Sequence, residues 1–119
     1  MDKQLTFSLW LQLQKVPDVY KRQARDYPLT EIKLLSILPV NEGEEYKQTV
    51  YIRTNEKIQK WNQAYQDLAS AYMQVEFVPV FDSLTDQAGQ LKKDYTTDGL
   101  HLSVAGYQVL TKSLKDYLL

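Results

Sequence analysis

The feature that most constrains the fold is a pair of short apolar runs separated by one long amphipathic segment. Residues 32–38 form a nearly continuous apolar run that ends at Pro39, and residues 75–80 form a second run with Pro79 near its end. Short apolar runs of this kind are typical of parallel strands covered on both faces, and a proline is tolerated where strand pairing stops. We therefore predict two strands of one parallel sheet.

The segment between the two runs has the spacing of a helix. Apolar side chains recur at intervals of three and four residues between residues 54 and 72, and either Thr54 or Asn55 can cap the first turn. The stripe consists of Ile58, Trp61, Tyr65, Leu68 and Tyr72. We expect these side chains to pack against the sheet, and we expect the neighbouring Asn62 to bond to a nearby loop.

A second helix is predicted at the C-terminus. Ser103 suits its N-cap, and the apolar positions that follow are Tyr107, Leu110, Leu114, Tyr117 and Leu118. The order strand, helix, strand, loop and helix predicts an α/β fold with three layers.

The polar stretch at residues 40–53 is expected to be a loop at the carboxyl end of the first strand. Open α/β sheets bind their ligands at that end, so Tyr46, Tyr51 and Arg53 are candidate substrate-facing residues. An ordinary solvated loop explains the same composition.

Composition excludes several classes of function. Fourteen basic and fifteen acidic residues nearly cancel, which argues against a nucleic-acid partner. The chain has no cysteine and one histidine, so we expect no disulfide, no metal site and no cofactor. No apolar run approaches the roughly 20 residues of a transmembrane helix. Residues 5–13 are too short and lack a cleavage site for a signal peptide, so a cytoplasmic location is the default expectation.

The candidate catalytic residues lie just before the last helix. His101 is the only histidine, Asp98 precedes it by three positions, and Gly99 permits a tight turn between them. Histidine suits general acid–base chemistry near neutral pH, and a nearby carboxylate can fix its tautomer and stabilise its charged form. A helix cap or a surface ion pair accounts for the same two residues without any catalysis.

The wider string favours catalysis. The string Asp98-Gly-Leu-His101-Leu-Ser-x-x-Gly106-Tyr107, which follows a Tyr-Thr-Thr lead-in, closely resembles the last conserved block of the SGNH, or GDSL-like, hydrolases. The likeness extends over residues 24–119, and it includes Leu38-Pro-Val-Asn41, Ile58-x-x-Trp61-Asn62 and the second predicted strand.

This resemblance implies the C-terminal part of a flavodoxin-like α/β/α sandwich. It also implies a serine ester hydrolase that acts on a small ester substrate, in which His101 is the general base and Asp98 orients it. An acetylated sugar, a lysophospholipid or another small acyl ester would fit, and the sequence does not choose among them.

Other parts of the family pattern are missing from the chain. Neither a Gly-Asp-Ser block with the nucleophile nor the Gly-x-Asn-Asp oxyanion block occurs, and Asn41 does not match the latter. The serines considered in their place, none in a matching context, are Ser8, Ser36, Ser83 and Ser103. We therefore predict that this chain alone is an inactive fragment that is marginally stable and self-associates.

Residues 1–23 do not resemble the rest of the chain, and we interpret them as a non-native leader. Residues 18–23 read Asp-Val-Tyr-Lys-Arg-Gln, which the string GAT GTG TAT AAG AGA CAG encodes. That string resembles the mosaic end of a common transposon sequencing adapter. The alternative is a native basic loop, and amplification of the locus from source DNA distinguishes the two.

Two other functions compete with the hydrolase. The first is a non-catalytic α/β binding or interaction module, in which Asp98 and His101 only close the loop before the helix. The second is a response-regulator-like domain, which lacks support because no acidic cluster follows the first strand.

Overall fold

The structure is a computed structural model that describes residues 31–118. Its sheet consists of β1 (Ile32–Leu35) and β2 (Val75–Val78), which pair in parallel with Ile32 opposite Val75 and Leu35 opposite Val78. The predicted parallel strands are therefore confirmed, although both are shorter than their apolar runs. The predicted leader, residues 1–23, lies outside the described residues, so its boundary stays a prediction.

The predicted helix between the strands is α3 (Asn55–Ser70). Thr54 caps it, because its side chain accepts a hydrogen bond from the backbone N–H of Lys57. Ala69 near the end of the helix and Val75 on β2 form a buried cluster. The partly buried side chains packed against this cluster are Ile32, Leu34, Leu68, Tyr72 and Phe77.

Two asparagines of α3 explain why the first strand ends early. The Asn62 side chain accepts from the backbone N–H of Ile37 at 2.7 Å and donates to the Ile37 carbonyl at 3.1 Å. Asn55 bonds both backbone groups of Val40 in the same way, at 2.8 and 2.7 Å. Because helix side chains satisfy this backbone, it needs no neighbouring strand at these positions. The predicted bond from Asn62 to a nearby segment is confirmed.

Two sequence-based expectations need correction. Residues 40–53 are not a plain loop, since they contain a 3-10 turn (Glu44–Tyr46) followed by the short helix α2 (Lys47–Val50). The C-terminal helix α4 (Val104–Leu118) forms as predicted, but Tyr107 and Leu118 are 57% and 61% exposed. The partly buried members of its stripe are Leu110, Leu114 and Tyr117.

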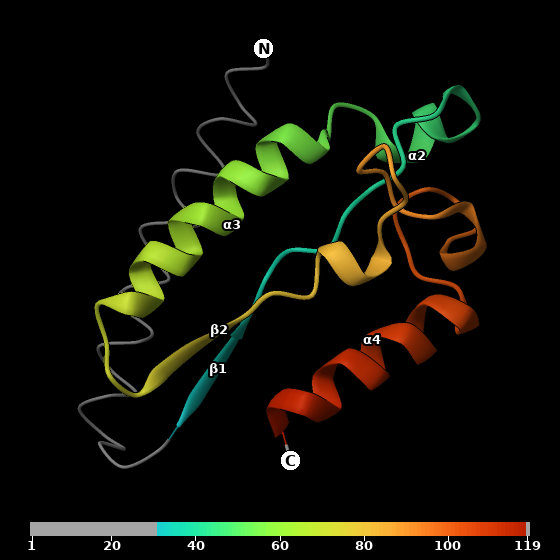
Figure 1. The fold of residues 1–119 in the computed structure, drawn as a ribbon. Coiled ribbons are helices and arrows are strands. Elements are labelled where there is room, and N and C mark those ends of the chain that lie inside the picture. Colours follow the sequence, from blue (N-terminus) through green and yellow to red (C-terminus); the bar gives the residue numbers. More distant parts are fainter. Residues whose placement is uncertain (1–30, 119) are drawn as a thin grey trace.

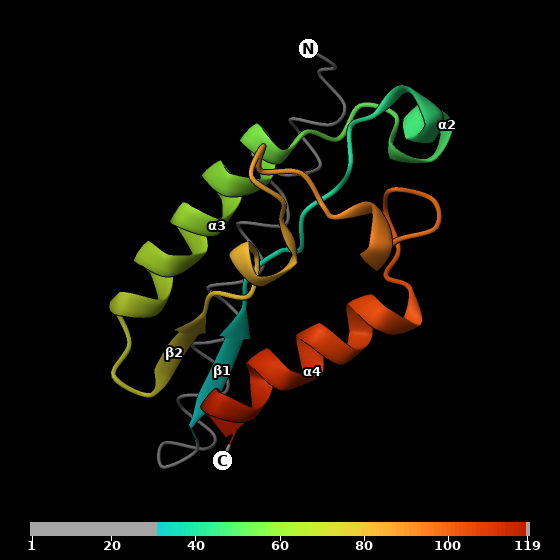
Figure 2. The ribbon, with the colours of Figure 1, turned by 45° about the vertical axis from the view of Figure 1, so that its right-hand side comes forward.

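The elements are arranged in three layers. In Figures 1 and 2, α3 and α4 lie on opposite sides of the two strands, and the segments that connect β2 to α4 lie beyond the carboxyl ends of the strands. The predicted α/β class is thus confirmed. Across residues 31–118, no helix combines the length and the apolar character that crossing a membrane requires.

Candidate active site

The structure brings Asp98 and His101 into direct contact. One carboxylate oxygen of Asp98, Oδ1, accepts hydrogen bonds from the backbone N–H groups of Leu100 at 2.9 Å and His101 at 2.7 Å. The other oxygen, Oδ2, lies 2.6 Å from Nδ1 of the His101 ring. Gly99 has a φ of +84°, a backbone conformation that residues other than glycine rarely adopt. The turn that was predicted from this glycine therefore exists.

The turn is docked against the segment that follows β1. The carbonyl of Gly99 accepts a 2.8 Å hydrogen bond from the backbone N–H of Asn41, which is itself buried. A Cβ atom at position 99 would lie only 2.5 Å from Cβ of Tyr46. Close approach of Tyr46 thus requires glycine here, independently of the positive φ.

The electrostatics of the pair follow from these contacts. The hydrogen bond from the His101 ring holds the pKa of the Asp98 carboxyl well below its usual range, and the two backbone N–H groups lower it further. The carboxylate is therefore ionised at neutral pH and accepts the Nδ1 proton. The His101 side chain is 72% exposed, and Nε2 is the ring nitrogen that Asp98 does not engage.

Comparison with known proteins shows the family of this chain. Residues 14–109 match the model of the GDSL-like Lipase/Acylhydrolase family. The chain belongs to this family. No curated protein matches it.

Solved structures support the same fold. One from Streptococcus pneumonia, described as a "putative platelet activating factor", is 76% identical with a TM-score of 0.90, and the match covers 93% of this chain and 52% of that chain. Another from Bacteroides fragilis, described as a "putative acylhydrolase", is 17% identical with a TM-score of 0.72, covering 92% of this chain and 50% of that one. At 17% identity the likeness shows the fold alone. This chain thus spans about half the length of the solved structures it matches.

Of the serines considered as nucleophiles in this GDSL-like chain, Ser36 and Ser103 bond to the backbone of the fold. Ser36 is 5% exposed, and its hydroxyl accepts from the backbone N–H of Val80. Ser103 caps α4, since its hydroxyl accepts from Gly106 and donates to the carbonyl of Asp94. Ser83 lies in the 3-10 turn Asp82–Leu84, and Ser8 is outside the described residues.

The predicted substrate-facing residues occupy different positions. Tyr46 packs against Gly99 of the turn. Tyr51 follows α2, is 72% exposed and has a φ of +58°. The Arg53 guanidinium donates to the carbonyls of Thr49 and Val50, which makes it part of the end of α2.

Sequence reasoning missed one residue of the site, Thr96. Its side chain is buried, accepts a 2.9 Å hydrogen bond from the N–H of Gly99, and donates a 2.6 Å hydrogen bond to the carbonyl of His101. A hydroxyl residue two positions before the aspartate is the only sequence signal for it.

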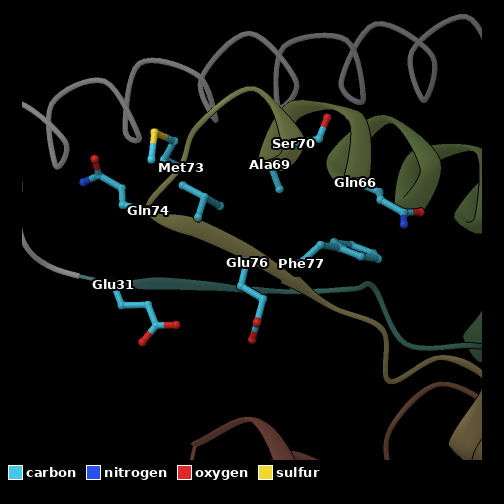
Figure 3. Close-up of a pocket in the computed structure, with 9 residues that line it drawn as sticks. Glu31, Gln66, Ala69, Ser70, Met73, Gln74, Glu76 and Phe77 are labelled. Atoms are coloured by element: carbon cyan, nitrogen blue, oxygen red, sulfur yellow. The ribbon is translucent and has the colours of Figure 1, made fainter.

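Two pockets in the described part of the chain do not include Asp98 or His101. Figure 3 shows a pocket of about 360 Å³ between the C-terminal part of α3 and β2, lined by residues that include Gln66, Met73 and Phe77. A second pocket, of about 270 Å³, is lined by Ser36, by residues of α3 that include Asn62, and by residues such as Phe77 and Phe81 at and after β2. Within residues 31–118, no group of three or more His, Cys, Asp or Glu side chains is placed to hold a metal ion.

Proposed function

We propose that this chain is the C-terminal part of a serine ester hydrolase and carries the acid–base half of its catalytic triad. His101 is the general base, and Asp98 orients it and stabilises its charged form. The nucleophilic serine and the oxyanion donors would come from a preceding half that this chain lacks, which agrees with its coverage of about half of each matched structure.

The observation that carries this proposal is the 2.6 Å contact between Nδ1 of His101 and Oδ2 of Asp98, together with the exposure of the ring. With Nδ1–H bound to the carboxylate, Nε2 can take the proton of a serine hydroxyl as its oxygen attacks the ester carbonyl. The imidazolium then gives this proton to the departing alcohol. Water, activated by the same nitrogen, hydrolyses the acyl-enzyme.

The proposed substrate class is a carboxylic ester. The family description, which names lipase and acylhydrolase activities, supports this class. An acetylated sugar, a lysophospholipid or another small ester remain candidates. A direct screen of these three classes would rank them.

The decisive experiment restores the half that the chain lacks. A chimera joins the unmatched half of the Streptococcus protein to this chain, replacing the half that is 76% identical. We expect the chimera to hydrolyse p-nitrophenyl acetate, and we expect Asp98→Asn to reduce kcat by up to about 10⁴-fold because the ring loses its tautomer. His101→Ala should abolish most of the activity, whereas the neighbouring Asp94→Asn serves as the matched control and should retain it.

Three outcomes would contradict the proposal. An active chimera that tolerates His101→Ala would remove His101 from the mechanism. Turnover by the isolated 119-residue chain that disappears in His101→Ala would show that the chain supplies its own nucleophile. An inactive but folded chimera would instead favour the non-catalytic binding module.

A further inference from the structure

We propose that Thr96 is a positioning residue for the Asp98–His101 pair, because its buried hydroxyl holds the turn in the shape that brings the carboxylate to Nδ1. The structural part of this inference stands on the contacts of Thr96 alone, and its catalytic consequence rests on the proposed function.

The hydroxyl of Thr96 joins the two sides of the turn. It accepts the N–H of Gly99 and donates to the carbonyl of His101, at 2.9 and 2.6 Å. The Thr96 side chain is 5% exposed, which leaves little room for water to replace these bonds. A β-bridge between Thr96 and Leu102 closes the loop on its far side.

Gly99 is fixed through both of its peptide groups as a result. Its carbonyl accepts from Asn41, and its N–H donates to Thr96. The carboxylate of Asp98 then holds the next two N–H groups, so the N–H groups of residues 99, 100 and 101 all have partners. The Thr96 hydroxyl supplies the buried one of these hydrogen bonds, the one to the Gly99 N–H.

Only a hydroxyl fills this role at position 96. A hydroxyl donates one hydrogen bond and accepts others at a single atom, whereas the nearly isosteric valine does neither. Thr96→Val would leave the buried Gly99 N–H without its partner and remove the donor to the partly buried His101 carbonyl, and the turn would open to satisfy these groups. Thr96→Ser keeps the hydroxyl and loses only a methyl group.

An open turn has a specific chemical consequence. Both hydrogen bonds of the Thr96 hydroxyl go to backbone groups, those of Gly99 and His101, so Thr96 acts on the imidazole ring through the backbone of the turn. When the ring moves away from the Asp98 carboxylate, the hydrogen bond that favours the Nδ1–H tautomer of the neutral imidazole is lost. The nitrogen that should accept the serine proton is then protonated in part of the molecules.

The test uses the 119-residue chain itself, in which His101 is the only histidine. Imidazole ¹⁵N chemical shifts therefore report one ring and its tautomer. We expect Nδ1–H in the parent chain and in Thr96→Ser, and a mixture of tautomers in Thr96→Val. Asp98→Asn should also give a mixture, and Thr97→Val, which alters the exposed neighbour, should match the parent. A folded Thr96→Val chain with the parent tautomer overturns the proposal.

A second measurement covers the case in which Thr96→Val does not fold in isolation. In the chimera described above, Thr96→Val should lower kcat by up to about 100-fold with KM unchanged, since a misplaced base affects the reaction more than binding. Thr96→Ser should restore kcat. An active chimera whose kcat is unaffected by Thr96→Val overturns the inference, whereas an inactive parent chimera counts against the proposed function and leaves the tautomer result to decide the role of Thr96.

Discussion

The two ends of the sheet are built differently. At and beyond the carboxyl ends of the strands lie the largest fully buried side chains, which are Pro39, Val78, Val80, Leu84 and Leu91. The buried polar residues Ser36, Asn41, Asn55, Asn62 and Thr96 lie at the same end. Toward the amino ends, the buried cluster consists of Ala69 and Val75 with partly buried neighbours, and Met73 is fully exposed.

This difference shows which end of the sheet has its backbone hydrogen bonds and its core packing supplied by the described residues themselves. The carboxyl end satisfies its own backbone through side chains such as Asn55, Asn62 and Thr96, so the Asp98–His101 turn has the support it needs. The amino end presents the exposed Met73 and the partly buried Phe77 at the pocket of Figure 3. The predicted self-association of the isolated chain concerns this end and stays a prediction.

The largest expected effect comes from removing core volume at the carboxyl end. Leu84 is 0% exposed, so Leu84→Ala should lower the free energy of unfolding by about 2–5 kcal/mol. Met73→Ala at the amino end should change it by less than about 0.5 kcal/mol, because Met73 is already in water. Urea denaturation followed by circular dichroism measures both, and equal losses would erase the contrast between the two ends.

A pair of glycines gives a smaller and more local comparison. Gly89 and Gly99 both have positive φ, but an added Cβ meets nothing within 4 Å at Gly89 and meets Tyr46 at 2.5 Å at Gly99. Gly89→Ala should therefore cost about 1–2 kcal/mol of backbone strain. Gly99→Ala should cost more by the energy of moving Tyr46, and it should also disturb the His101 tautomer. Equal stabilities and an unchanged tautomer would show that the turn does not need this close packing.

The smallest expected effect is the pH dependence, which has opposite signs at the two ends. The pKa of Asp98 is lowered in the fold, so its stabilisation is present above the ordinary carboxyl pKa and is lost as pH falls through the folded value. The pKa of Lys33 is raised by hydrogen bonds to Glu31 and Glu76, so its stabilisation is present below the ordinary lysine pKa and is lost as pH rises through the folded value.

Denaturation midpoints measured against pH separate these two contributions. Asp98→Asn should flatten only the acid side of the profile, and Lys33→Gln only the alkaline side. In His101→Ala the pKa of Asp98 should rise, yet remain below its ordinary value, because the two backbone N–H donors persist. A single variant that flattens both sides would contradict the assignment.

Much of the fold was predictable because its signals are periodic or local. The 3- and 4-residue spacing from Ile58 to Tyr72 predicts α3, and Thr54 fixes its start. Gly99 predicts the contact of Asp98 with His101, since it permits the turn that joins them.

The misses have physical causes of their own. Helix α2 has four residues, too few for any periodicity to show. The first strand ends at Leu35 because side chains from α3, distant in sequence, bond the backbone that follows, and Tyr107 is apolar yet exposed. Thr96 was missed because its importance depends on two backbone groups that only the folded turn brings to its hydroxyl.

The two asparagines of α3 fix the position of this helix along the segment that follows β1. Asn55 and Asn62 are seven residues apart, which is about 10.5 Å along a helix. Val40 and Ile37 are three residues apart, which is about 10 Å along an extended chain. The two spans agree, so both amides engage at once, and a slide of one helical residue would mismatch both. The helix can therefore separate from the segment that follows β1, but it cannot slide along this segment while both asparagines keep their hydrogen bonds.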